Sequence, residues 1–233
     1  MGQRWHDVLF AHWRVEPEAL QTLLPLPLEV DTFDGAAWIA IVPFAMTAVR
    51  ARGLPGFSRV SSFLELNVRT YARVDDVDGV YFFSLDAASR SAVAAARRWF
   101  HLPYFNARME LQQRADRIDY QSRRTHRGAE QAHVALSYRP TGPGSPAEPG
   151  SLDHWLVERY RLLTDRPDGT IVTGEIHHGP WVLQPAEAEF HINSMTDWLG
   201  VELAPAPDHL CFARFQDVYI WRPRPLAGDD ANR

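Results

Sequence analysis

The strongest alternation of polar and apolar residues is Glu65-Leu66-Asn67-Val68-Arg69-Thr70-Tyr71, inside a run from Phe63 to Arg73. Successive side chains of a strand point to opposite faces, so this pattern predicts a strand. One face would be mostly apolar and the other would carry a carboxylate, an amide, a guanidinium and a phenol. Such a strand belongs to a sheet that buries at least one of its faces.

Similar runs on both sides predict further strands. They begin at Trp5 and Ala37 and, after the central run, at Val80, Pro103, Arg117, Gln131, Tyr160, Thr170, Val182 and Leu210. Pro43 interrupts the second run, where we expect a bend or bulge. A hairpin is expected around Ala115-Asp116. Short helices are expected at residues 17–24, 89–99 and 151–159, with Ser89 and Ser151 as N-caps.

These elements come in runs, without strict β-α-β alternation. About ten strands and three or four helices predict a mixed α+β, β-rich fold. Its core would be a largely antiparallel β-barrel or sandwich, flanked by a few short helices. The 233 residues suit one domain, 1–233, with an ordered core at about 5–222. Residues 50–59 are expected to form a loop, 140–150 a mobile loop and 223–233 a frayed tail.

Composition excludes several functions. All 24 basic residues are arginine, so the chain has no side-chain amine for a Schiff base. The net charge of −5 makes nucleic acid an unexpected partner. Cys211 is the only cysteine, which excludes an internal disulfide, and we expect a buried, inert thiol. Without an apolar leader or a membrane-length apolar run, we expect a cytoplasmic protein that does not bind membranes.

The polar face of the central run is the first candidate site. Glu65, Asn67, Arg69 and Tyr71 share that face by their spacing. If it lines a barrel interior, it suits an anionic ligand, because Arg69 can bind a carboxylate in bidentate fashion. If it faces solvent, it is only the wet side of a half-buried sheet. The alternation alone leaves both interpretations open.

Two further clusters contribute candidate residues. Arg97 and Arg98 end the expected helix 89–99, where positive charge suits the helix dipole. Beyond them, Tyr104, Asn106 and Arg108 share one strand face. Near the C-terminus, Glu175 and His177 share a face, which would suit acid–base work or a structural pair. No other His or Cys stands at metal-ligand spacing near this cluster, so no metal is expected there, and no other cofactor is expected.

These stretches also carry a resemblance. The segments 28–38, 65–71 and 79–86 resemble the YqjF-like bacterial family of uncharacterised proteins (DUF2071). The likeness continues through Ala96-Arg97-Arg98, Leu102-Pro103-Tyr104, Ser151-Leu152, Glu158-Arg159-Tyr160 and Glu175-Ile176-His177-His178 with Trp181. It extends over nearly the whole chain, roughly from Trp5 to Trp221.

That family looks similar in fold to acetoacetate decarboxylase. The resemblance implies a β-barrel-like core with flanking helices and a mostly apolar central pocket. It implies that Tyr104 and Phe105 stand where the decarboxylase keeps two lysines, and that Glu65 resembles its pocket glutamate. With no lysine in the chain, decarboxylation through an iminium is excluded.

Three functions remain. The first is a lysine-independent enzyme acting on a small carbonyl or carboxylate compound, with catalytic residues Glu65, Tyr104 and His177. Its ligand-binding residues would be Arg69, Asn67, Tyr71, Arg97, Asn106, Arg108 and Trp181. The second is a non-catalytic module that binds or senses a small apolar or anionic ligand. The third is a scaffold with a filled core and a homo-oligomer interface.

Overall fold

The computed structural model describes residues 1–50 and 62–226. Most of the loop expected at 50–59 and most of the tail expected at 223–233 lie outside these residues. Within them, three α-helices and one 3₁₀ turn occur, α1 (Pro17–Gln21), α2 (Arg90–Trp99), α3 (Leu152–Val157) and η1 (Asp197–Leu199). Strands dominate the described chain, as the sequence predicts.

The described strands follow one another in long antiparallel stretches. They are β1 (Gly2–Val15), β2 (Glu29–Val30), β3 (Ala37–Arg50), β4 (Phe63–Val74), β5 (Val77–Ala87), β6 (Tyr104–Arg114), β7 (Arg117–Arg124), β8 (His133–Pro140), β9 (Ser145–Pro146), β10 (Arg161–Asp165), β11 (Ile171–His178), β12 (Val182–Asn193), β13 (His209–Ile220) and β14 (Arg224–Pro225). The β6–β7 hairpin turns at Ala115-Asp116, which confirms that prediction.

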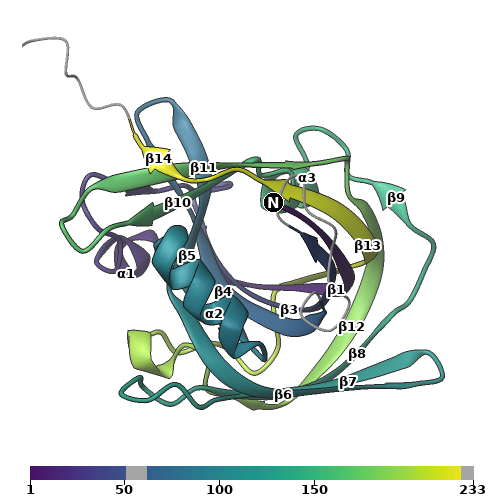
Figure 1. The fold of residues 1–233 in the computed structure, drawn as a ribbon. Coiled ribbons are helices and arrows are strands. Elements are labelled where there is room, and N and C mark those ends of the chain that lie inside the picture. Colours follow the sequence, from purple (N-terminus) through teal and green to yellow (C-terminus); the bar gives the residue numbers. More distant parts are fainter. Residues whose placement is uncertain (51–61, 227–233) are drawn as a thin grey trace, which may run out of the picture.

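The strand pairings close two rings. A seven-strand ring runs β5-β4-β3-β1-β13-β11-β10 and returns to β5, and Figure 1 looks down it. A nine-strand ring shares β5, β4, β3, β1 and β13 with the first and closes through β6, β7, β8 and β12. Two parallel pairings occur, β5 with β6 and β5 with β10, and the others are antiparallel.

Each ring encloses its own apolar core. On β1, Phe10 belongs to the core of the seven-strand ring, whereas Leu9 and Ala11 belong to that of the nine-strand ring. The same alternation separates Trp38 from Ile39 on β3. The shared strands are therefore buried on both faces. This explains why their sequences contain continuous apolar runs as well as alternating ones.

Local signals explain the boundaries of the elements. The Ser89 and Ser151 hydroxyls accept hydrogen bonds from the backbone N–H groups of Ala92 and His154, so both predicted N-caps are confirmed. The ladder between β1 and β3 shifts register between the pairs His6–Ala45 and Ala11–Ile41. Pro43 lies in this interval and has no N–H to donate, so the irregularity falls where it was expected.

The segment 140–150 makes defined backbone contacts. Residues Ser145–Pro146 form β9 and pair with β12. The Thr141 backbone N–H donates to the Pro185 carbonyl at 2.8 Å, and the Gln184 side-chain amide donates to the Gly142 carbonyl at 2.7 Å. The segment therefore follows the edge of β12, although its composition resembles that of an unattached loop.

Candidate functional site

The polar face of β4 points into the seven-strand ring. Glu65, Asn67, Arg69 and Tyr71 are only 2%, 1%, 6% and 0% exposed. Tyr71 belongs to the apolar core of that ring, and its neighbours on β3 and β5 bury the strand on both sides. The solvent-facing interpretation of this alternation is therefore wrong. The face is a row of buried polar groups.

Glu65 and Tyr104 form the central pair of the site. The Tyr104 hydroxyl donates to Glu65 Oε2 at 3.0 Å. The contact arises because α2 carries the chain from the end of β5 back to β6, which runs parallel to β5. This pairing sets Tyr104 beside Leu85, and Leu85 in turn pairs with Asn67 of β4. Burial raises the pKa of Glu65 to about 8; the charge of Asp86 adds to this, and the Tyr104 hydrogen bond opposes it. Near neutral pH Glu65 thus holds a proton that it is able to give up.

Removing the Tyr104 hydroxyl should raise the pKa of Glu65 further. The phenol stabilises the carboxylate form, so Tyr104→Phe withdraws the one interaction that lowers this pKa. The measurement is an NMR titration of glutamate side-chain carboxyl carbons, with Glu65→Gln to assign the signal. Tyr160→Phe, which removes a hydroxyl bonded to Glu158, is the matched control and should leave the Glu65 titration unchanged. A lower Glu65 pKa in Tyr104→Phe would contradict this assignment.

Arg69 lies two positions further along the same face and is only loosely bound. Its Nη2 donates to the Tyr71 hydroxyl at 3.5 Å and to the Leu156 carbonyl at 3.4 Å, both long contacts. Its Nε is buried and has no hydrogen-bond partner in the described chain. A buried guanidinium with spare donors is suited to an anion. Its guanidinium also lies over the ring of Phe10, 5.4 Å from the centroid.

A histidine that the sequence analysis did not consider completes the polar set. His12 of β1 is fully buried, and its Nε2 lies 2.8 Å from the Tyr71 hydroxyl. Burial, followed by the charges of Arg69 and His209, holds the pKa of His12 well below its usual value, so the ring is neutral. The sequence does contain a signal for His12: it lies two residues after Phe10, and therefore shares the inward face of β1.

Tryptophans line the same interior. Trp5, Trp38 and Trp181 all belong to the core of the seven-strand ring. Each has a buried indole N–H with no hydrogen-bond partner among the described residues. The Asn67 Oδ1 is in the same condition. Buried polar atoms usually have partners, so a concentration of unpaired ones around an aromatic lining indicates a place where a ligand or water completes them.

The remaining predicted site residues lie elsewhere. Glu175 and His177 do share a face, but both are exposed on β11, and His177 packs edge-on against Trp221. The prediction that His177 assists Glu65 is therefore wrong, because the pairing of β11 with β13 turns His177 outward. Arg108 is also exposed, 3.6 Å from Glu110, and so does not reach the interior.

Arg97 and Asn106 stand close to the site. Arg97 Nη1 donates to the Tyr104 backbone carbonyl at 2.8 Å, so it holds the start of β6 in place. The Asn106 backbone N–H donates to His126 Nδ1 at 3.2 Å. Both contacts support the strand that carries Tyr104. The buried Oδ1 of Asn106 has no hydrogen-bond partner within the described chain, and the ligand contacts expected of both residues stay a prediction.

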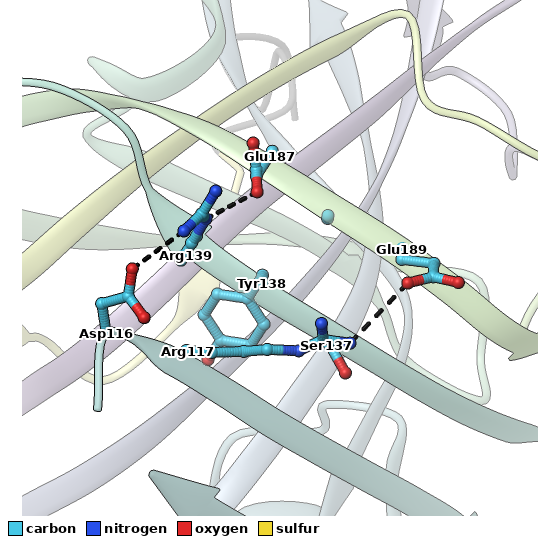
Figure 2. A pocket seen from close by; sticks show the side chains of 8 residues that line it. Asp116, Arg117, Ser137, Tyr138, Arg139, Glu187 and Glu189 are labelled. Atoms are coloured by element: carbon cyan, nitrogen blue, oxygen red, sulfur yellow. Dashed lines mark hydrogen bonds and ion pairs between the residues drawn. The ribbon is translucent and has the colours of Figure 1, made fainter. Parts of the chain in front are cut away.

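A groove of about 450 Å³ lies on the outer surface over β7, β8 and β12. Figure 2 shows that its charged side chains pair with one another. Arg139 binds Asp116 and Glu187 at 2.9 and 2.6 Å, and Arg117 lies 3.7 Å from Glu189. These charged groups already pair with one another at an exposed surface, so they offer a ligand less than the unpaired polar groups of the interior do.

Comparison with known proteins identifies the relatives of this chain. The model of a family described as an uncharacterised conserved protein, DUF2071, matches residues 2–217. The uncharacterised protein YqjF of Bacillus subtilis (strain 168) is 47% identical over 221 residues, covering 95% of this chain and 90% of that protein.

Solved structures share the fold at low identity. The enduracididine biosynthesis enzyme MppR, complexed with pyruvate, superposes with a TM-score of 0.64 at 14% identity, covering 97% of this chain and 90% of that one. Acetoacetate decarboxylase from Legionella pneumophila gives 0.61 at 13% identity, covering 97% and 88%. The strand-rich chain thus has an acetoacetate decarboxylase-like fold. None of its described helices has the length and apolar content needed to cross a membrane.

Proposed function

Since the chain belongs to the DUF2071 family, we propose that it is a lysine-independent enzyme that uses acid–base catalysis on a small carbonyl or carboxylate compound. The observation that carries the proposal is the buried Glu65, with a pKa of about 8, hydrogen-bonded to Tyr104. A carboxyl group tuned to neutral pH inside a protein is the usual requirement for moving a proton to and from carbon.

The spacing along β4 defines the size of the substrate. Four residues of strand place the α-carbons of Glu65 and Arg69 about 13 Å apart. A substrate that contacts both side chains, each reaching inward from its end, would therefore be a molecule of a few heavy atoms. Arg69 would bind its carboxylate, and Asn67, between them, would offer an amide to a polar substituent.

The proton transfer follows from these positions. In its ionised form Glu65 takes a proton from the carbon next to the substrate carbonyl. The C–H electron pair forms the enolate C=C bond, and the carbonyl pair moves onto oxygen. Tyr104 donates a hydrogen bond to that developing oxyanion, and Glu65 then returns the proton to carbon. No amine takes part, which agrees with the absence of lysine from the chain.

Exchange of substrate protons with solvent tests the proposal directly. Pyruvate is the first probe, because MppR is described in complex with it; other small 2-oxo acids and ketones complete the panel. In D₂O the chain should accelerate loss of the methyl proton signal. Glu65→Gln should reduce the acceleration by at least about a hundredfold. Arg69→Gln should weaken binding, whereas the matched Arg108→Gln, on the exposed face, should behave as wild type.

A non-catalytic binding module is the second candidate function. The observation that favours it is the group of three unpaired tryptophan N–H donors in the interior, which can hold a ligand without any chemistry. Saturable quenching of tryptophan fluorescence by a panel member, without proton exchange, would support this function and contradict the enzyme. If no panel member causes either quenching or proton exchange, both candidate functions are contradicted.

A further inference from the structure

A second cluster of reactive side chains lies where α3 meets β13. We propose that Asp153, His209 and Cys211 form a binding site for a transition-metal ion of the Zn²⁺ type. One ligand atom from each residue lies within 4.8 Å of the other two. Asp153 Oδ1 and His209 Nε2 are 2.8 Å apart. The three supply oxygen, nitrogen and sulfur, the donor atoms that Zn²⁺ takes in proteins.

The fold brings these residues together from distant parts of the chain. His209 and Cys211 are two positions apart on β13 and therefore share its inward face. Their partners on β1 are His12 and Phe10, both of which line the seven-strand ring. Asp153 stands in the first turn of α3, whose Trp155 packs against Tyr71 with ring centroids 4.7 Å apart.

The cluster contains buried polar atoms without partners. Asp153 Oδ1 contacts His209 Nε2 at 2.8 Å, whereas His209 Nδ1 is buried and makes no hydrogen bond within the described chain. His12 is fully buried beside them, with its ring centroid 5.8 Å from that of His209, and its Nδ1 also has no partner there. Buried ring nitrogens usually have hydrogen-bond partners, so two without one, beside a carboxylate and a thiol, indicate a missing ligand. A cation would use them.

The dimensions and charges suit a tetrahedral ion. Zinc bonds of about 2.0 to 2.3 Å place neighbouring ligand atoms roughly 3.3 to 3.7 Å apart, so small side-chain rotations suffice. The carboxylate and the thiolate together would neutralise a divalent ion. The Cys211 thiol would release its proton to solvent as the metal–sulfur bond forms. Three protein ligands leave a fourth position for water, which is the arrangement of catalytic zinc sites.

A path for the ion is also present. The Asp153 and His209 side chains are 43% and 22% exposed, whereas Cys211 is buried. The ion would thus enter from solvent past the carboxylate and meet the sulfur last. From there His12 and the Tyr71 hydroxyl connect the site to Arg69, so a bound ion would stand beside the polar face of β4.

Cobalt substitution gives a direct test. The metal-free, tag-free chain is titrated with Co²⁺ and followed by absorption. We expect one ion per chain, the intense visible bands of tetrahedral Co²⁺, and a near-ultraviolet thiolate-to-cobalt band. Because Cys211 is the only cysteine, that band reports this residue alone. Zn²⁺ should displace Co²⁺ and abolish both signals.

Variants assign the other ligands. Asp153→Asn and His209→Asn should each weaken Co²⁺ binding at least tenfold, and Cys211→Ala should lose the thiolate band. His177→Asn, an exposed histidine on the neighbouring β11, is the matched control and should bind as wild type. Circular dichroism checks folding, and the wild-type spectrum decides the question even if Cys211→Ala does not fold. A missing thiolate band in wild type, or undiminished affinity in both asparagine variants, would overturn the proposal. Neither result bears on the Glu65 exchange test, which uses no metal.

Discussion

Replacing Arg124 with methionine is expected to lower the free energy of unfolding by about 3 to 5 kcal/mol. Arg124 Nε and Nη2 each donate to Asp86 at 2.8 Å, and the two side chains are 2% and 0% exposed. The guanidinium lies 4.1 Å from the centroid of the Phe105 ring, which closes one side. Without Arg124, Asp86 would be left as an uncompensated charge in the core. Urea denaturation at neutral pH measures the loss.

Two comparisons show whether burial of the ion pair causes the loss of stability in Arg124→Met. Arg139→Met removes an equally well-bonded arginine from the exposed groove of Figure 2, and it should change stability far less. The double variant Asp86→Leu with Arg124→Met removes both charges and should recover much of the loss, because apolar replacement of a buried pair is often neutral. Equal losses for Arg124→Met and Arg139→Met would contradict the importance of burial.

Glu65 should make the protein less stable as the pH rises from 4.5 to 8. Its pKa is about 8 in the folded chain, against 4.5 for the free side chain. Between these values the unfolded chain releases the proton and the folded chain keeps it, so the folded state is progressively disfavoured. Below about pH 4.5 both states hold the proton and the penalty vanishes. Above about pH 8 both release it, and the penalty stays constant.

The difference of 3.5 pKa units, at 1.36 kcal/mol each, amounts to about 5 kcal/mol. The measurement compares urea denaturation of wild type and Glu65→Gln between pH 4 and 9. The glutamine variant keeps an acceptor for Tyr104. Its free energy of unfolding should rise steadily relative to that of wild type as the pH increases across this range. Glu110→Gln, which alters an exposed carboxylate, should follow wild type throughout. A difference curve for Glu65→Gln that is flat, or that slopes the other way, would mean that Glu65 is ionised in the folded chain at neutral pH.

The sequence predicts which residues of a strand share a face, but not whether that face lies in the interior or at the surface. The alternation on β4 correctly groups Glu65 with Arg69, yet only the closure of the seven-strand ring places that face inside. The same alternation correctly groups Glu175 with His177, and there the group lies outside. The two cases look alike in sequence because the deciding factor is the neighbouring strands, which are distant along the chain.

Contacts between remote segments were beyond prediction. The Glu65–Tyr104 hydrogen bond depends on the parallel pairing of β5 with β6, and no local turn pattern in the sequence predicts this pairing. The resemblance did place Tyr104 at a pocket position, whereas periodicity alone placed it only on a strand. Asp153 meets His209 and Cys211 because a short helix packs at one end of a ring whose closure the sequence does not reveal.

The first two residues of β6 separate two environments by a single backbone step. Tyr104 faces Glu65 on one side, and Phe105 covers the Arg124–Asp86 pair on the other. A one-residue slip of β6 against β5 would exchange the two, setting a phenyl ring against the carboxylate and a phenol against the ion pair. A slip of two residues would keep each ring on its own face of the strand. The register of the parallel β5–β6 pairing therefore maintains the candidate site and the buried ion pair together.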